Sequence, residues 1–250
     1  MISIDLRGKN ALITGGTRGI GQAISRRLAE AGANTAAVYR RDAAAADLSL
    51  HERQAFGRGT HKNYQANIAE ERQVDALVTE VLAEHAEGLD ILVLNAGVGL
   101  RGKVTEVEPA QWRHMLDVNL GSAFLLSRGL VPHLRRGGSI VAIGSGSGQD
   151  PLPGLAFYGA SKAALNIFIA DLAQEVGPNG IRANVVSPGS TDAAFQGNAP
   201  SPISIHENSK HNALRRRGVP DDVAGVVLFL CSDLSGFVTG QVIRVNGAAL

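Results

Sequence analysis

The sequence predicts an α/β protein in which seven parallel strands form one doubly wound sheet. Three observations favour this fold class. Short strand-like segments alternate with longer segments of helical periodicity along all 250 residues. Some of the short segments, such as Ile91–Leu94, are continuously apolar, as strands buried on both faces of a parallel sheet are. A glycine-rich turn joins the first strand to the first helix.

Each predicted strand is a short segment bounded by turn residues. In chain order, the strands are Asn10–Thr14, Thr35–Tyr39, His61–Ala66, Ile91–Leu94, Ser139–Ile143, Arg182–Val186 and Gln241–Val245.

The predicted helices lie between these strands. The first begins near Ile20 and ends at Gly32, and residues 40–60 hold a loop and a short helix. The others are Glu70–His85, Ala110–Leu134, Tyr158–Val176 and Pro220–Cys231. Val74, Leu77 and Val81 show the basis of these assignments, since they recur on one helical face.

No internal repeat or linker divides the chain, so we expect residues 1–250 to form a single domain. The least regular stretch is 190–218, with Pro200, Pro202 and many polar residues. A long loop in a compact domain is usually functional, and we expect this one to contact the substrate.

Composition excludes several classes of protein. The 24 Lys and Arg residues balance 23 Asp and Glu residues, and aromatic residues make up 4% of the chain, so nucleic-acid binding is not expected. Cys231 is the only cysteine, and the His206–His211 spacing does not resemble a zinc site, so no disulfide or metal centre is expected. No segment is apolar for long enough to span a membrane. We therefore expect a cytoplasmic protein.

The glycine-rich turn reads Thr14-Gly15-Gly16-Thr17-Arg18-Gly19-Ile20-Gly21. Its glycines allow a tight turn and a close approach of the backbone to a phosphate. The N-terminus of the following helix supplies N–H donors. Taken alone, such a string can be an ordinary turn. The strand–turn–helix context instead favours a Rossmann-type dinucleotide site.

Further polar residues follow other strands. Asn95-Ala96-Gly97 ends the fourth strand, and Ser145 follows the fifth. Tyr158 and Lys162 lie four residues apart in the next predicted helix and therefore share one face. Because ligands bind at the carboxyl edge of such a sheet, we expect these residues to meet there.

These residues resemble the classical short-chain dehydrogenase/reductase family, and the match covers essentially the whole chain. The shared features are T-G-x-x-x-G-x-G at 14–21, N-A-G at 95–97, Asn119 in V-N-L, Ser145, Y-x-x-x-K at 158–162, Pro188-Gly189 and the run from Arg217 to Ala224. Tyr158 lies thirteen residues after Ser145, as is usual in the family. The chain looks most like the 3-oxoacyl reductase type. Residues 185–192 are also similar to dihydrodiol dehydrogenases that make aromatic acids.

The resemblance implies hydride transfer between a nicotinamide and a carbonyl or secondary alcohol. Tyr158 would be the general acid or base, with its pKa lowered by Lys162 and by the oxidised nicotinamide. Lys162 would also bind the nicotinamide ribose. Ser145, preferred to Ser147 on spacing, would bind the substrate oxygen. Asn119 would hold a water that links Lys162 to solvent.

The resemblance also implies a set of cofactor-binding residues. They are Gly15, Thr17, Arg18, Gly19, Ile20, Gly21, Tyr39, Arg40, Arg41, Asn67, Ile68, Asn95, Ala96, Gly97, Tyr158, Lys162, Pro188, Gly189 and Thr191. Asn67 stands where relatives often carry Asp. Ala193 stands where relatives often carry Thr, so either Ser190 or Thr191 would contact the nicotinamide amide.

We expect NADPH rather than NADH. Enzymes that use NAD place an acidic residue after the second strand, and Tyr39 occupies that position here. Arg40 follows, where many relatives that use NADP carry Arg, and Arg18 is a second cation for the same 2′-phosphate.

The leading function is therefore NADPH-dependent reduction of a ketone, 3-oxoacyl-like or from secondary metabolism. Two alternative functions remain open: oxidation of a cyclic alcohol or dihydrodiol, and a non-catalytic cofactor sensor.

The family implies a homotetramer or dimer, formed through the two long helices. The candidate apolar surface for this assembly consists of Phe124, Leu125, Phe168 and Ile169. Lys210, Arg215, Arg216 and Arg217 form a basic cluster that is either a solvated face or an attractor of acidic substrates or carrier proteins.

Overall fold

The computed structural model describes residues 4–192 and 212–249. Its strands form one seven-stranded sheet in the order β3-β2-β1-β4-β5-β6-β7, and every pair is parallel. The strands are β1 (Asn10–Thr14), β2 (Asn34–Tyr39), β3 (His61–Gln65), β4 (Leu89–Leu94), β5 (Leu134–Ile143), β6 (Arg182–Pro188) and β7 (Val242–Val245). The predicted fold class is confirmed.

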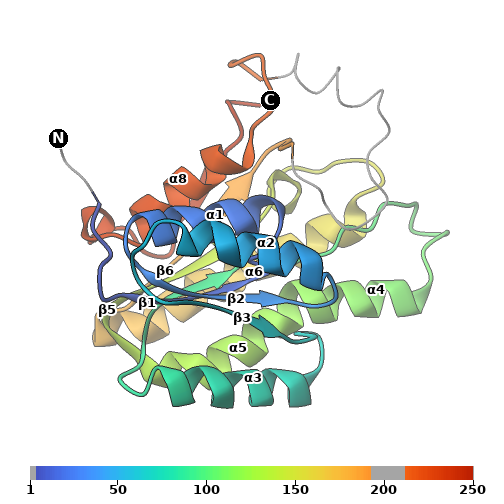
Figure 1. Cartoon of the computed structure of the whole chain (residues 1–250). Coiled ribbons are helices and arrows are strands. Elements are labelled where there is room, and N and C mark those ends of the chain that lie inside the picture. Colours follow the sequence, from blue (N-terminus) through green and yellow to red (C-terminus); the bar gives the residue numbers. More distant parts are fainter. Residues whose placement is uncertain (1–3, 193–211, 250) are drawn as a thin grey trace.

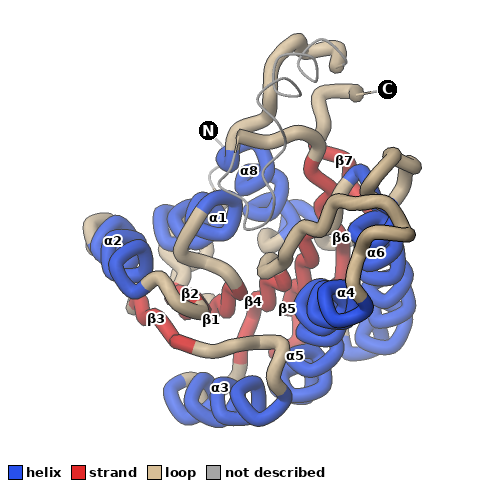
Figure 2. Tube along the Cα trace, turned by 90° about the vertical axis from the view of Figure 1, so that its right-hand side faces the viewer, coloured by secondary structure: helices blue, strands red, loops and turns tan. Residues whose placement is uncertain are grey.

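Helices cover both faces of the sheet (Figures 1 and 2). They are α1 (Gly19–Glu30), α2 (Ala43–Gln54), α3 (Glu71–Glu84), α4 (Pro109–Leu116), α5 (Ser122–Leu130), α6 (Ala156–Val176) and α8 (Pro220–Leu230). One core cluster joins the sheet to α1 and α8, and the other joins it to α3, α5 and α6. Neighbouring residues of β1 divide between the two clusters because side chains alternate along a strand: Ile13 joins the first and Leu12 the second.

The long helix predicted over Ala110–Leu134 is wrong in detail. α4 ends at Leu116, a π-helical turn covers Asp117–Gly121, and α5 ends at Leu130. A short 3₁₀ turn then contains Pro132, and Leu134 already pairs with β4. Proline lacks an N–H group and clashes with the carbonyl four residues before it, so the helix cannot continue to Leu134.

The helix expected within residues 40–60 is longer than predicted. α2 has 12 residues, and Asp42 caps it by accepting a hydrogen bond from Ala45 N at 3.0 Å. Arg53 of α2 is fully buried and donates to Thr35 and Asn63, which lie on β2 and β3. This contact fixes α2 against the edge of the sheet.

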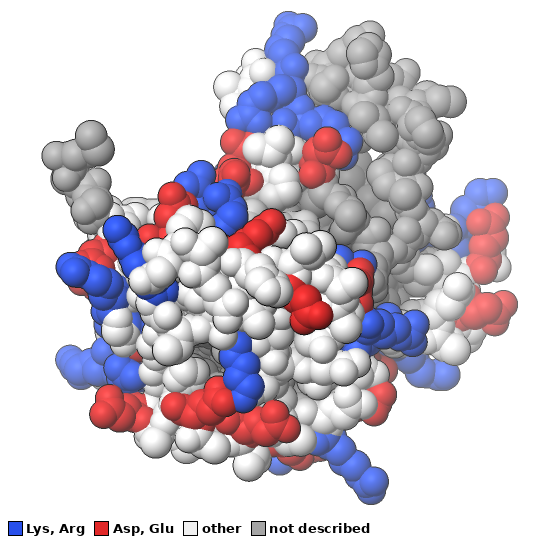
Figure 3. Space-filling view, in the orientation of Figure 1, with Lys and Arg blue, Asp and Glu red and all other residues white. Residues whose placement is uncertain are grey.

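Acidic and basic side chains are interspersed over the face shown in Figure 3, as expected from the near-neutral net charge. In the part of the chain that the structure describes, no helix is long and apolar enough to cross a membrane.

Candidate active site

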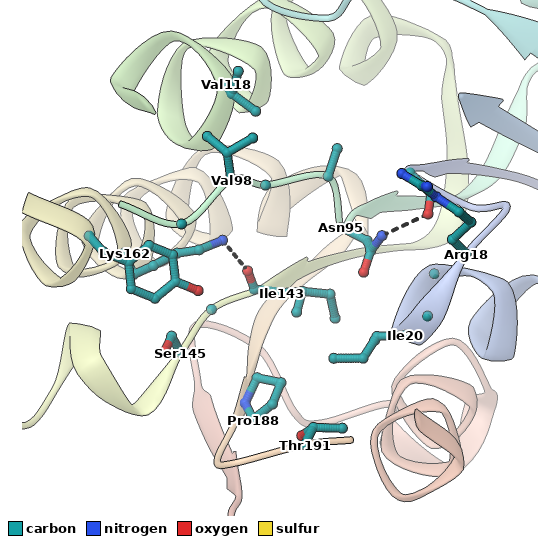
Figure 4. Close-up of a pocket in the computed structure, with 18 of the residues that line it drawn as sticks. Arg18, Ile20, Asn95, Val98, Val118, Ile143, Ser145, Lys162, Pro188 and Thr191 are labelled. Carbon is teal, nitrogen blue, oxygen red and sulfur yellow. Dashed lines mark hydrogen bonds between the residues drawn. The ribbon is translucent and has the colours of Figure 1, made fainter. Parts of the chain in front are cut away.

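A cavity of about 630 Å³ lies at the carboxyl edge of the sheet. All the predicted catalytic and cofactor-binding residues line it except Asn119. Ser145 and Lys162 lie on one side of it, and Arg18 lies on the opposite side (Figure 4). Ser190 also lines it, whereas Ala193, His206, Lys210 and His211 lie outside the described residues.

The glycine loop is held against β4 by two side chains. The Thr14 hydroxyl accepts from Asn95 N at 3.0 Å and from Ala96 N at 3.1 Å, while Asn95 Nδ2 donates to Thr14 O at 2.8 Å. A Cβ at Gly21 would lie 2.0 Å from Gly15 O, so a larger residue would displace this turn. Gly15 has a φ of +61°, which favours glycine. The loop is thus a rigid, open cradle of backbone N–H groups at the N-terminus of α1, and it suits a diphosphate.

Four charged side chains lie where β1 and β2 end. Arg40 and Arg41 line the cavity, and neither has an ion pair with a described residue. Arg18 pairs with Asp42, with Arg18 Nη1 3.0 Å from Asp42 Oδ2. Sequence reasoning missed Asp42. Its signal was its position directly before an alanine-rich helix, where a capping residue is expected.

The three residues of the reacting end converge. The Ser145 side chain lies close enough to the Tyr158 hydroxyl to favour ionisation of the phenol. Lys162 Nζ donates to Ile143 O at 2.8 Å and lies 6.0 Å from the centroid of the Tyr158 ring. Ser145, and not Ser147, lines the cavity.

Burial shifts the pKa values of both Tyr158 and Lys162. It raises the pKa of Tyr158, although the neighbouring Ser145 side chain opposes this shift. It lowers the pKa of Lys162 to about 8. The raised pKa keeps the Tyr158 phenol protonated near neutral pH in the protein alone.

The Ser145 loop is packed tightly onto α6. A Cβ at Gly148 would lie 2.8 Å from the carbonyl carbon of Lys162, and a Cβ at Gly159 would lie 2.6 Å from Ser147 O. Only glycine permits this approach at both positions. The loop and the helix that carry Ser145, Tyr158 and Lys162 therefore form one rigid unit.

Asn119 lies behind the cavity wall, in the π-helical turn. Its side chain is 3% exposed and bonds to the backbone of Val98, which lines the cavity, and to Ser161 Oγ. Both N–H groups of the Asn119 amide are used in these bonds. Its direct role is to position the loop that follows β4.

Two predicted residues are held by local bonds. Asn67 Nδ2 donates to Glu70, and Thr191 Oγ1 donates to Gly189 O at 3.1 Å. Both still line the cavity. Sequence reasoning did not single out Leu100, Arg101 and Leu155, which line the same cavity. Leu100 and Arg101 follow β4, and that position was their only signal. Asp192 and Arg217 also line the cavity and belong to the stretch 190–218 that was expected to contact the substrate.

A family model described as enoyl-(acyl carrier protein) reductase matches residues 15–248. The chain belongs to the short-chain dehydrogenase/reductase family. It is 37% identical over 246 residues to an uncharacterized oxidoreductase of Methylorubrum extorquens, covering 97% of this chain and 98% of the relative. It is 33% identical to the 3-oxoacyl-[acyl-carrier-protein] reductase of Aquifex aeolicus, covering 98% and 99%.

A solved relative also contains a cofactor. The short-chain dehydrogenase of Burkholderia cenocepacia in complex with NADP superposes with a TM-score of 0.90 and is 35% identical, with 97% of this chain and 98% of that chain covered. The family and fold together show that this protein is an oxidoreductase of the short-chain dehydrogenase/reductase type.

Proposed function

We propose that this short-chain dehydrogenase/reductase reduces a ketone to a secondary alcohol with NADPH. The observation that carries the proposal is that Ser145 and Tyr158 lie side by side at one end of a cavity whose other end is the glycine loop. A dinucleotide that spans the cavity would bring its reactive ring beside two hydroxyl groups. The substrates are 3-oxoacyl-like compounds or secondary-metabolite ketones.

NADPH supplies the hydride, and the protein supplies the proton and the orientation. Tyr158 gives its proton to the carbonyl oxygen, and Ser145 donates a second hydrogen bond to that oxygen. Lys162 binds the nicotinamide ribose and orients the site. Asn119 positions the loop after β4, which lines the cavity.

The preference for NADPH rests on charge. Arg18, Arg40 and Arg41 all line the end of the cavity next to β2, against a single carboxylate, Asp42. Arginine binds a phosphate through two parallel hydrogen bonds. A 2′-phosphate in this region is therefore favoured over a ribose hydroxyl.

The test is consumption of NADPH and NADH by the purified protein with a panel of ketones that includes 3-oxoacyl thioesters and cyclic ketones. Turnover with NADPH that disappears in Tyr158→Phe supports the proposal. The absence of turnover with every ketone, combined with oxidation of alcohols by NADP⁺, would instead support a dihydrodiol or cyclic alcohol dehydrogenase. NADPH binding without turnover in either direction would support a cofactor sensor.

We also propose that residues 1–250 act as one cytoplasmic cofactor-binding domain, with 190–218 contacting the substrate, and that the protein forms a homotetramer or dimer. Phe124 on α5 and Ile167 on α6 are 52% and 64% exposed, and these large apolar side chains support this assembly. Of the four residues predicted for this surface, Ile169 is fully buried and is excluded. Light scattering at micromolar concentration tests the assembly, since a monomer mass contradicts it.

A further inference from the structure

The charges that line the cavity are strongly unbalanced. Among the described residues, the basic ones are Arg18, Arg40, Arg41, Arg101, Lys162 and Arg217, and the acidic ones are Asp42 and Asp192. The whole chain carries almost no net charge, so this excess belongs to the cavity. It favours anionic ligands.

The basic residues form two groups at separate parts of the sheet edge. Arg18, Arg40 and Arg41 follow β1 and β2. Arg101 follows β4, and Arg217 lies beside Thr191 and Asp192, which follow β6. β2 and β6 are four strand spacings apart in the sheet, or about 19 Å. This separation applies to Arg217. Arg101 follows β4, which is next to β1, but its side chain lies against the turn before α6, the helix that carries Tyr158.

Arg101 has no partner of opposite charge within the described ranges. No described carboxylate forms an ion pair with it, whereas the neighbouring Lys103 pairs with Glu106. The side chain lies over the turn before α6, since a Cβ at Gly154 would be 3.5 Å from Arg101 Nε. This turn leads into Leu155, which also lines the cavity. Arg101 thus stands at the mouth, close to apolar lining.

The Arg217 guanidinium has acceptors for only two of its three nitrogen atoms among the described residues. Its Nη2 donates to Thr191 O at 3.0 Å, and its Nη1 lies 3.3 Å from Asp192 Oδ1. Its Nε is buried and has no hydrogen-bond partner among the described residues. A buried N–H without an acceptor is unfavourable, so an acceptor supplied by a ligand would stabilise it. The side chain of Asp192 is 75% exposed, so its ion pair with Arg217 is screened by solvent and is weak.

We infer that the substrate is an oxo or hydroxy carboxylic acid with a hydrocarbon frame, and that Arg101, assisted by Arg217, binds its carboxylate. This inference rests on the proposed oxidoreductase function and narrows its substrate class. The planar guanidinium group matches a carboxylate through two parallel hydrogen bonds. Val98, Leu100 and Leu155 line the same end of the cavity and provide apolar contacts for the frame.

The first experiment compares an acid with its neutral ester. Values of kcat/KM are measured for 4-oxocyclohexanecarboxylate and its methyl ester with NADPH, and for the corresponding 4-hydroxy pair with NADP⁺. The wild type should prefer the acid by about tenfold or more, as expected for a charge-assisted hydrogen bond. Arg101→Gln should remove this preference and leave the ester within about threefold. Arg113→Gln is the matched control, because Arg113 is exposed on α4 and does not line the cavity.

Asp192→Asn should change kcat/KM for the acid in the opposite direction from Arg101→Gln. It removes the carboxylate that competes for Arg217, so kcat/KM for the acid should rise severalfold while that for the ester stays unchanged. A fall for the acid, or an equal change for both compounds, overturns the role of Arg217. Equal kcat/KM for acid and ester in the wild type overturns the inference and leaves the proposed function standing.

Binding without turnover separates the two proposals. In the presence of NADP⁺, benzoate and its neutral analogue benzamide are titrated by calorimetry into the wild type and Arg101→Gln. Tighter binding of benzoate that is lost in Arg101→Gln supports the carboxylate site even if no substrate turns over. Equal binding of the two compounds overturns it. Weakened NADPH binding in Arg101→Gln, measured by nicotinamide fluorescence, also overturns it by assigning Arg101 to a cofactor phosphate.

Discussion

The side chain of Asn119 closes a ring of hydrogen bonds with the backbone of Val98. Its Oδ1 accepts from Val98 N at 2.8 Å, and its Nδ2 donates to Val98 O at 3.0 Å. A second bond from Nδ2 reaches Ser161 Oγ at 3.0 Å. One buried amide therefore joins the loop after β4, the π-helical turn and α6.

Replacing this amide should weaken the fold as well as catalysis. Asn119→Leu leaves the N–H and the carbonyl of Val98 without these partners and removes one bond to Ser161 Oγ, which still donates to Tyr158 O. We expect the free energy of unfolding to fall by about 1–3 kcal/mol. Urea denaturation measures the loss. A positioning role also predicts that kcat falls at every pH without a shift of the pH profile. A shifted profile at unchanged stability would contradict it and would favour direct proton relay.

Tyr158→Phe should abolish turnover while NADPH binding is preserved. The ring and its packing remain, but the proton donor is lost. General acid–base groups contribute roughly 10²–10⁴ in rate. Steady-state assays give kcat, and fluorescence titration gives the Kd for NADPH. A kcat near the wild-type value with the natural substrate would show that Tyr158 is not the acid.

Arg40→Ala should weaken NADPH binding by about ten- to a hundredfold and leave NADH binding nearly unchanged, because only the 2′-phosphate loses a charged hydrogen bond. Fluorescence titration with both cofactors provides the measurement. Arg58→Ala, which removes an exposed cation outside the cavity, is the control. An equal loss of both cofactors would refute the assignment.

Asp42→Asn should have the opposite effect on NADPH. Asp42 now pairs with Arg18 at 3.0 Å, so it repels a phosphate and competes for the guanidinium. Asparagine still caps α2, so stability should be kept. We expect the Kd for NADPH to fall severalfold and that for NADH to change little. Unchanged NADPH binding would mean that Arg18 does not reach the 2′-phosphate.

Lys162 should make stability depend on pH in the alkaline range. Burial lowers its pKa to about 8 from an ordinary value of 10.5. Between these values the unfolded chain holds the proton and the folded chain releases it, so stability rises with pH across this window. Lys162→Met, which has no titrating group, should lack this rise in urea denaturation from pH 7 to pH 10. Parallel curves for the two proteins would place the pKa of Lys162 outside the window.

The sequence was sufficient to predict the sheet, because strand periodicity and the glycine loop are local signals. It also indicated which residues would meet at the cavity, since parallel strands end at one edge. The ion pair of Arg18 with Asp42 could not be predicted, because its partners come from different loops and their separation depends on the packing of α2. Arg53 looks like a solvated residue in sequence, yet it is fully buried. Ile169 was misplaced because apolar residues of α6 lie on several of its faces.

The π-helical turn at Asp117–Gly121 has a consequence for how this region tolerates changes in length. Such a turn holds one residue more than an α-helical turn does. If this turn became regular α-helix with the same number of residues, every later side chain would rotate by about 100° relative to α4. Asn119 could not then face Val98 while Leu126 stays in the core. Deleting one residue from the turn would instead restore regular α-helix and leave the alignment of α5 with α4 unchanged, so a one-residue deletion here should be tolerated better than a conversion to α-helix at constant length.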